Sequence, residues 1–126
     1  MALLLLLTGC NSEWLAQRER NAQANVTAPA NYKAEIVALM RSYLNDPTNV
    51  RDAYISAPEL RTFENISRYS VCLRYNPRKD NGQFAGSKES VVLFSHGRLE
   101  RIIDNARGQC KDAAYQPFRE LETMSR

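Results

Sequence analysis

The sequence has almost no histidine and lacks the residue groupings that enzymes use. Its single histidine, His96, precedes Gly97 in a predicted two-residue hairpin turn, where a polar residue is expected for structural reasons alone. No nucleophile elbow, phosphate-binding loop or set of metal ligands at the usual spacing is present. We therefore expect a non-catalytic protein with no catalytic residue, no metal and no cofactor.

A strong charge of either sign is also lacking. The 126 residues include 17 basic and 14 acidic side chains, which leaves a formal net charge of +3. The basic residues are spread along the chain, whereas nucleic-acid-binding domains concentrate them on one face. Nucleic acid is therefore not an expected partner. The composition, 44% hydrophobic and 25% charged, is typical of one small globular domain.

Beyond Leu7 there is no apolar run of the length, about 18 residues, that a membrane-spanning helix requires. The apolar residues that open the chain end in Leu7-Thr8-Gly9-Cys10, which resembles the lipobox of bacterial lipoproteins. In that family the cysteine receives a diacylglycerol and a signal peptidase cuts before it. The resemblance implies that Cys10 carries acyl chains such as palmitate, and several such chains together hold a protein stably on a membrane.

The same resemblance implies a location. Asn11 follows the cysteine in place of the aspartate that, in enteric bacteria, tends to hold lipoproteins at the inner membrane. We therefore expect a lipid-anchored protein of the bacterial cell envelope, with the outer membrane favoured and the domain in the periplasm. An export signal normally begins with a basic region, and none precedes Cys10. Residues 1–9 are accordingly expected to be a truncated signal peptide, with the true start upstream of Met1.

Residues 10–30 are predicted to be a flexible tether. They are rich in Ala, Asn, Gln and Arg, a composition that buries too little apolar surface to offset the entropy of ordering. Trp14 and Leu15 are the exceptions. Close to the lipid, the indole would lie at the level of the headgroups; a simple exposed tryptophan is the alternative.

Residues 31–126 are predicted to form a single α+β domain. Its helix has Asn31 as N-cap and ends at Asn45-Asp46-Pro47, because proline disfavours helical geometry in the residue before it. The helix carries an apolar stripe at the spacing of one helical face, made of Ile36, Leu39, Met40, Tyr43 and Leu44.

After the helix the apolar period changes to two, which is typical of strands. We expect strands over residues 50–56, 67–75, 89–95 and 99–104, the last two joined at His96-Gly97. A polar loop from Ala57 through Asn65 and a long connection from Pro77 to Ser87 separate them. The predicted fold is one N-terminal amphipathic helix packed on an antiparallel sheet of three or four strands.

Two cysteines remain after Cys10, and in an oxidising envelope Cys72 and Cys110 are expected to form a disulfide. A metal site or a catalytic thiol lacks the histidine pair or the Cys-x-x-Cys motif that it would need. Cys72 alternates with the apolar face of its strand, so the segment after Asp104 should return across the side of the sheet opposite the helix. Four apolar residues are expected to cover part of that side: Tyr115, Phe118, Leu121 and Met124.

The candidate binding residues lie in and beside the connection after the strand 67–75. They are Arg74, Arg78, Lys79, Phe84 and Lys88. An aromatic residue among arginines is typical of protein interfaces and of surfaces that bind anionic glycans; a solvated loop with a glycine turn is the alternative. We therefore predict a binding or accessory module whose partner is an envelope protein or an anionic glycan. An inhibitor of a host or periplasmic hydrolase, similar to lysozyme inhibitors, is the alternative, and a small enzyme comes after it.

The spacing of several short motifs adds a second resemblance. They occur in the order Asn45-Asp46-Pro47, Val71-Cys72, Asn76, Asn81–Gly86 and Val91–Phe94. This order resembles an uncharacterised family of small exported bacterial proteins, many of them lipoproteins and alphaproteobacterial, over residues 31–118. The resemblance supports the expected fold and location, and it implies no activity and no catalytic residue.

Overall fold

The computed structural model describes residues 12–18 and 27–126. The predicted lipid attachment at Cys10 and the predicted signal peptide lie outside these ranges. Residues 12–18 form a short helix within the segment predicted to be a tether. Its Trp14 is 59% exposed, and the Arg18 guanidinium lies 4.9 Å from the centre of the indole ring. Among the helices of the described ranges, none has both the length and the apolar character needed to cross a bilayer.

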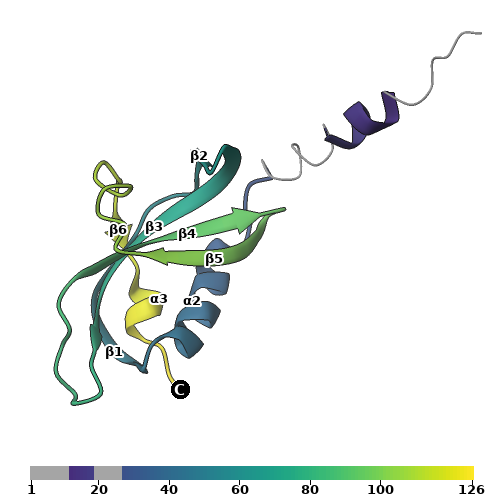
Figure 1. The fold of residues 1–126 in the computed structure, drawn as a ribbon. Coiled ribbons are helices and arrows are strands. Elements are labelled where there is room, and N and C mark those ends of the chain that lie inside the picture. The colour runs from purple at the N-terminus through teal and green to yellow at the C-terminus, as the bar shows by residue number, and fades with distance from the viewer. Residues whose placement is uncertain (1–11, 19–26) are drawn as a thin grey trace, which may run out of the picture.

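The domain is built on a six-stranded antiparallel sheet in the order β5-β4-β3-β1-β6, with β2 also paired to β3. Figure 1 shows α2 and α3 against one face of this sheet. The elements are α2 (Tyr32–Tyr43), β1 (Asp46–Ile55), β2 (Glu59–Phe63), β3 (Ile66–Arg78), β4 (Lys88–Ser95), β5 (Arg98–Asp104), β6 (Gln116–Pro117) and α3 (Arg119–Glu122).

The predicted α+β class is confirmed, but one helix on three or four strands is wrong. The structure adds β2, β6, α3 and the helix over residues 12–18. Strand β2 occupies a segment that was expected to be a polar loop. It was missed because its side chains are largely exposed and its apolar residues show no clear alternation. It pairs with the first half of β3 through a turn in which Glu64 and Asn65 have positive φ. The second half of β3 pairs with β1, so the 13-residue β3 holds two partners along one edge.

Alternation along β3 produces a core on each face of the sheet, as predicted. Val71, Leu73 and Tyr75 point toward the helices and pack with Ile36 and Met40 of α2, all of them fully buried or nearly so. Cys72 points the other way. It packs in a smaller cluster with Val91, Leu93, Ala106 and Cys110.

The C-terminal segment corrects one prediction. Tyr115 lies on the disulfide side of the sheet as expected, whereas Phe118, Leu121 and Met124 belong to the core on the helix side. The reason is β6, which pairs with β1 at the edge of the sheet. Pairing there carries the chain round the edge between Tyr115 and Phe118, and the Phe118 amide donates to the Ala53 carbonyl at 2.8 Å.

Glu35 attaches α2 to the start of β5. Its carboxylate accepts hydrogen bonds from Arg98 Nε at 2.6 Å and from the Leu99 amide at 2.8 Å. The turn next to these residues has positive φ at both His96 and Gly97, which confirms the predicted hairpin. Asn31 occupies the N-cap position, but its side chain makes no capping hydrogen bond.

Candidate functional site

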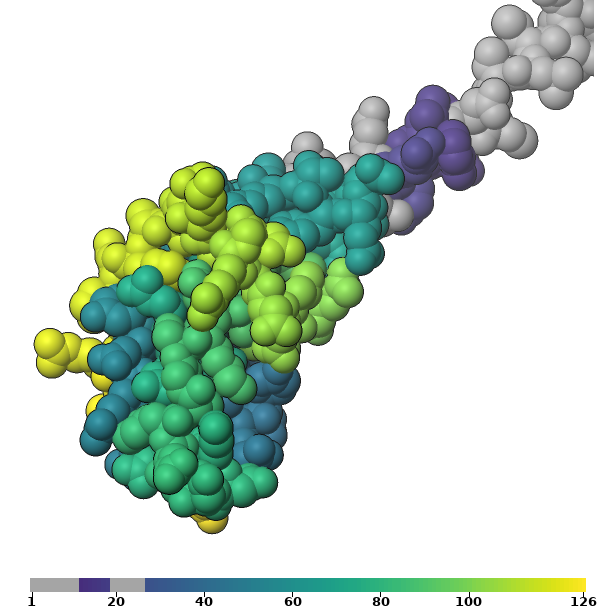
Figure 2. Space-filling view, turned by 60° about the vertical axis from the view of Figure 1, so that its left-hand side comes forward, coloured from purple at the N-terminus to yellow at the C-terminus, as the bar shows by residue number. Residues whose placement is uncertain are grey.

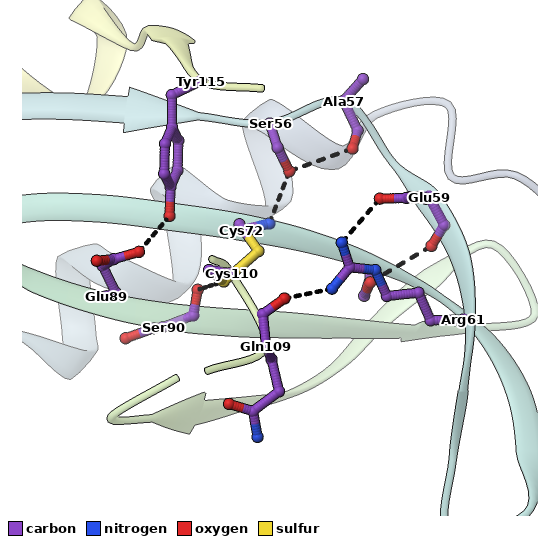
Figure 3. The surroundings of a disulfide bond; sticks show 11 residues. Ser56, Ala57, Glu59, Arg61, Cys72, Glu89, Ser90, Gln109, Cys110 and Tyr115 are labelled. Carbon is purple, nitrogen blue, oxygen red and sulfur yellow. Dashed lines mark hydrogen bonds and ion pairs between the residues drawn. A yellow bond between two sulfur atoms is a disulfide. The ribbon is translucent and has the colours of Figure 1, made fainter. Parts of the chain in front are cut away.

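Cys72 and Cys110 form the predicted disulfide, which closes a loop between residues 38 positions apart (Figure 3). Both cysteines are buried, and the Cys72 amide donates to Ser56 Oγ at 2.8 Å. The bond fixes the segment after β5 onto the side of the sheet opposite the helices. That segment brings Tyr115 beside β3.

Arg74 of β3 lies between two tyrosine rings on this side. Its guanidinium carbon is 4.7 Å from the ring centre of Tyr54, its partner on β1, and 4.6 Å from that of Tyr115. The Tyr115 hydroxyl donates to Glu89 at 2.9 Å (Figure 3). Burial and this carboxylate raise the pKa of the Tyr115 phenol, so the hydroxyl remains a donor. The two rings attract the guanidinium and hold its plane in place.

Phe84 forms a second stack near the end of β3. The Arg51 guanidinium lies 4.1 Å from the centre of its ring, and that of Arg78 lies 5.0 Å away. Phe84 belongs to the β3–β4 connection. It pairs with Arg78 at the end of β3 through an isolated antiparallel β-bridge. The Gly86 amide donates to Asn76 Oδ1 at 2.9 Å, which fixes the same connection to β3.

Arg51 reaches Phe84 because β1 is irregular at this point. The pairing of β1 with β3 shifts register on both sides of Arg51, and Asn49 and Asp52 have φ of 58° and 51°. Such bulges turn a side chain to a new direction and are common beside functional sites. Asn and Asp tolerate this backbone conformation better than other non-glycine residues, so their positions around Arg51 were the one sequence signal of the bulges.

We call the two stacks together the arginine–aromatic face. It consists of Arg51, Tyr54, Arg74, Arg78, Phe84 and Tyr115. Residues 74 and 78 of β3 point to the same side, and alternate residues of a strand are about 7 Å apart, so the stacks follow one another along β3. Figure 2 shows the green β3–β4 connection projecting at one end of the domain, with the yellow-green segment after β5 also in view.

The three arginines of this face differ from others in the domain. Arg61, Arg68 and Arg98 each form an ion pair with a glutamate. By contrast, no carboxylate of the described ranges lies within ion-pair distance of the guanidinium groups of Arg51, Arg74 or Arg78. No ion pair therefore occupies these three guanidinium groups, so they can bind an external anion. Two acidic side chains lie beside the stacks: Glu89 accepts from the Tyr115 hydroxyl, and Asp46, the cross-strand partner of Arg78, interacts with it electrostatically.

The structure divides the predicted binding residues between two places. Arg74, Arg78 and Phe84 lie on the arginine–aromatic face, as a group. Lys79 and Lys88 instead line a cavity on the helix side of the sheet, to which Arg78 also contributes. Sequence reasoning missed Arg51, Tyr54 and Tyr115, which come from distant segments.

Within residues 12–18 and 27–126, no group of three His, Cys, Asp or Glu side chains is arranged to hold a metal ion. Comparison with family models, with curated proteins and with solved structures finds no match to this chain.

Proposed function

We propose that this chain is a lipid-anchored protein of the bacterial envelope whose domain is a non-catalytic binding module for an anionic glycan. The observation that carries the proposal is the set of three guanidinium groups stacked on aromatic rings and free of carboxylate partners. The lipobox-like Leu7-Thr8-Gly9-Cys10 supports the anchor, and the disulfide agrees with an oxidising compartment.

The stacked arginines favour a ligand with carboxylate, phosphate or sulfate groups. A guanidinium binds these groups through two parallel hydrogen bonds. Stacking has already restricted the arginine side chains, so less conformational entropy is lost when the ligand binds.

The arrangement of the stacks favours a linear polymer over a small anion. The stack at Arg74 and the stack at Phe84 follow one another along β3, so one extended chain can contact both. The second contact is then intramolecular and strengthens binding without any new kind of interaction.

Replacing Arg51 and Arg78 by glutamine tests this face. Hydrogen bonds to charged groups contribute about 1.5–3 kcal/mol each, so we expect Arg51→Gln/Arg78→Gln to weaken binding of a carboxylated glycan by about 100-fold or more. The measurement is isothermal titration calorimetry with oligogalacturonate, and with neutral dextran as the uncharged reference.

The matched control is Arg101→Gln/Arg119→Gln, which removes the same charge from β5 and α3. This control should change the affinity by less than about threefold. Equal losses in both double variants would mean that net charge alone attracts the glycan. Binding of polyglutamate with no binding of oligogalacturonate would identify an acidic protein as the partner and contradict the glycan proposal.

The lipid anchor is tested separately. Mass spectrometry of the membrane fraction, from cells that produce the protein, should find the Cys10 peptide with a diacylglycerol attached. Cys10→Ser should move the protein from the membrane fraction to the soluble one, because the acyl chains supply the membrane affinity. An unmodified peptide containing both Met1 and Cys10 would rule out the anchor.

A further inference from the structure

A cavity of about 650 Å³ opens on the helix side of the sheet, and Arg78 is the one residue of the arginine–aromatic face in its lining. It lies where α2 ends, between the end of β5 and the connection from β3 to β4. Leu44, Tyr75 and Pro77 form its apolar wall. Its volume falls within the range of small-molecule sites.

Asp104 holds a fixed carboxylate at one side of this cavity. Ser90 Oγ donates to Asp104 Oδ1 at 3.1 Å, and the Tyr43 hydroxyl donates to Asp104 Oδ2. Behind them, the buried Tyr75 hydroxyl is 3.4 Å from Ser90 Oγ. Burial and the neighbouring Asp104 raise the pKa of Tyr43, which keeps its hydroxyl a donor.

The Asp104 carboxylate can accept further hydrogen bonds from a ligand. Each carboxylate oxygen has two acceptor positions, and one donor is placed at each oxygen of Asp104. No lysine or arginine of the part of the chain that the structure describes lies within ion-pair distance of it. Asp104 is therefore a negative group, exposed to the cavity and held in place by two hydroxyls.

Basic side chains also line this cavity. Arg78, Lys79 and Lys88 all border the cavity, with Asp80 as the one further acidic residue in its lining. The Nε of Arg78 is buried and has no hydrogen-bond partner within the described chain, which is unusual for a buried donor. Lys88 pairs with Tyr75, and it precedes Ser90 by two residues on β4, so its backbone lies about 7 Å from that of Ser90.

We propose that this cavity binds a small zwitterion, such as a short peptide with free termini. The ligand carboxylate lies at Lys88, its ammonium group lies at Asp104, and its apolar part contacts Leu44 and Pro77. A simple anion would be repelled by Asp104, and a simple cation by the basic wall. Opposite charges in one cavity therefore select a ligand that carries both.

Three forms of one dipeptide separate these alternatives. Alanyl-alanine carries both charges, its N-acetyl form only the carboxylate, and its amide only the ammonium group. We expect saturable shifts of the backbone amide signals of Tyr43, Lys88 and Asp104 on titration with alanyl-alanine, followed by NMR. Each capped form should bind at least tenfold more weakly. An N-acetyl form that binds as tightly as the zwitterion would overturn the proposal, and so would the absence of shifts at these amides.

Two substitutions locate the charges. Asp104→Asn and Lys88→Gln should each weaken alanyl-alanine binding at least tenfold. Lys111→Gln and Asp112→Asn are the matched controls, since both residues are exposed in the segment on the other side of the sheet, and they should leave the affinity unchanged. Lys88 is exposed, so its variant tests the site even if Asp104→Asn disturbs the fold. Wild-type affinity in both Lys88→Gln and Asp104→Asn would overturn the proposal.

Discussion

Replacing both Cys72 and Cys110 by alanine is expected to lower the free energy of unfolding by about 4 kcal/mol. The disulfide joins residues 38 positions apart, and a closed loop of that length restricts the unfolded chain by roughly this amount. Domains of this size have a total stability of about 5–15 kcal/mol, so the loss is a large fraction of it. Urea denaturation followed by far-ultraviolet circular dichroism measures the change.

Reduction of the unaltered protein provides an independent measurement. A thiol-free reductant should produce a loss similar to that of the alanine pair, because both remove the same constraint. Cys10→Ser should leave the urea midpoint unchanged, which separates the disulfide from the predicted lipid-bearing cysteine. A loss below about 1 kcal/mol in both experiments would show that the disulfide contributes little to this fold.

Local periodicity explains which parts of the fold could be predicted from the sequence. Residues 69–75 alternate between apolar and polar, and the structure places Val71 and Leu73 against the helices and Cys72 on the other side. The partner of Cys72 followed from this placement and from the cysteine count. The turn at His96-Gly97 was likewise recognisable, because two residues of suitable type separate two apolar runs.

The missed strands depend on partners that are distant in the sequence. Strand β2 has exposed Leu60 and little apolar content, so only its pairing with β3 identifies it as a strand. Strand β6 comprises two residues, Gln116 and Pro117, too few to show a period. The point at which the chain crosses the edge of the sheet could therefore not be predicted from the sequence. For this reason Phe118 was assigned to the wrong side of the sheet.

The candidate face shows the same limit. Arg74, Arg78 and Phe84 could be selected from the sequence, because they cluster along the chain. Arg51 and Tyr115 come from segments far away in sequence, and their position depends on the bulges of β1 and on the disulfide. The bulges and the disulfide place Arg51 and Tyr115 against the residues near the loop. The two stacks therefore have a fixed geometry that the sequence of the loop alone does not show.

Phe118→Ala is expected to lower the free energy of unfolding by about 3–5 kcal/mol. Phe118 is fully buried and packs in the core between α2, α3 and the sheet, where removal of an aromatic side chain leaves a cavity. Urea denaturation measures the loss. Phe84→Ala is the matched control, since the same side chain is removed from a partly exposed stack, and there we expect a loss of less than about 1.5 kcal/mol.

The size of this difference depends on where the chain crosses the edge of the sheet. Pairing of β6 with β1 and the hydrogen bond from the Phe118 amide to Ala53 place the crossing immediately before Phe118. If the chain instead stayed on the disulfide side, Phe118 would lie on a partly open surface beside Tyr115. Its removal would then cost no more than that of Phe84. Equal losses in the two variants would therefore contradict the crossing, and with it the assignment of Leu121 and Met124 to the helix side.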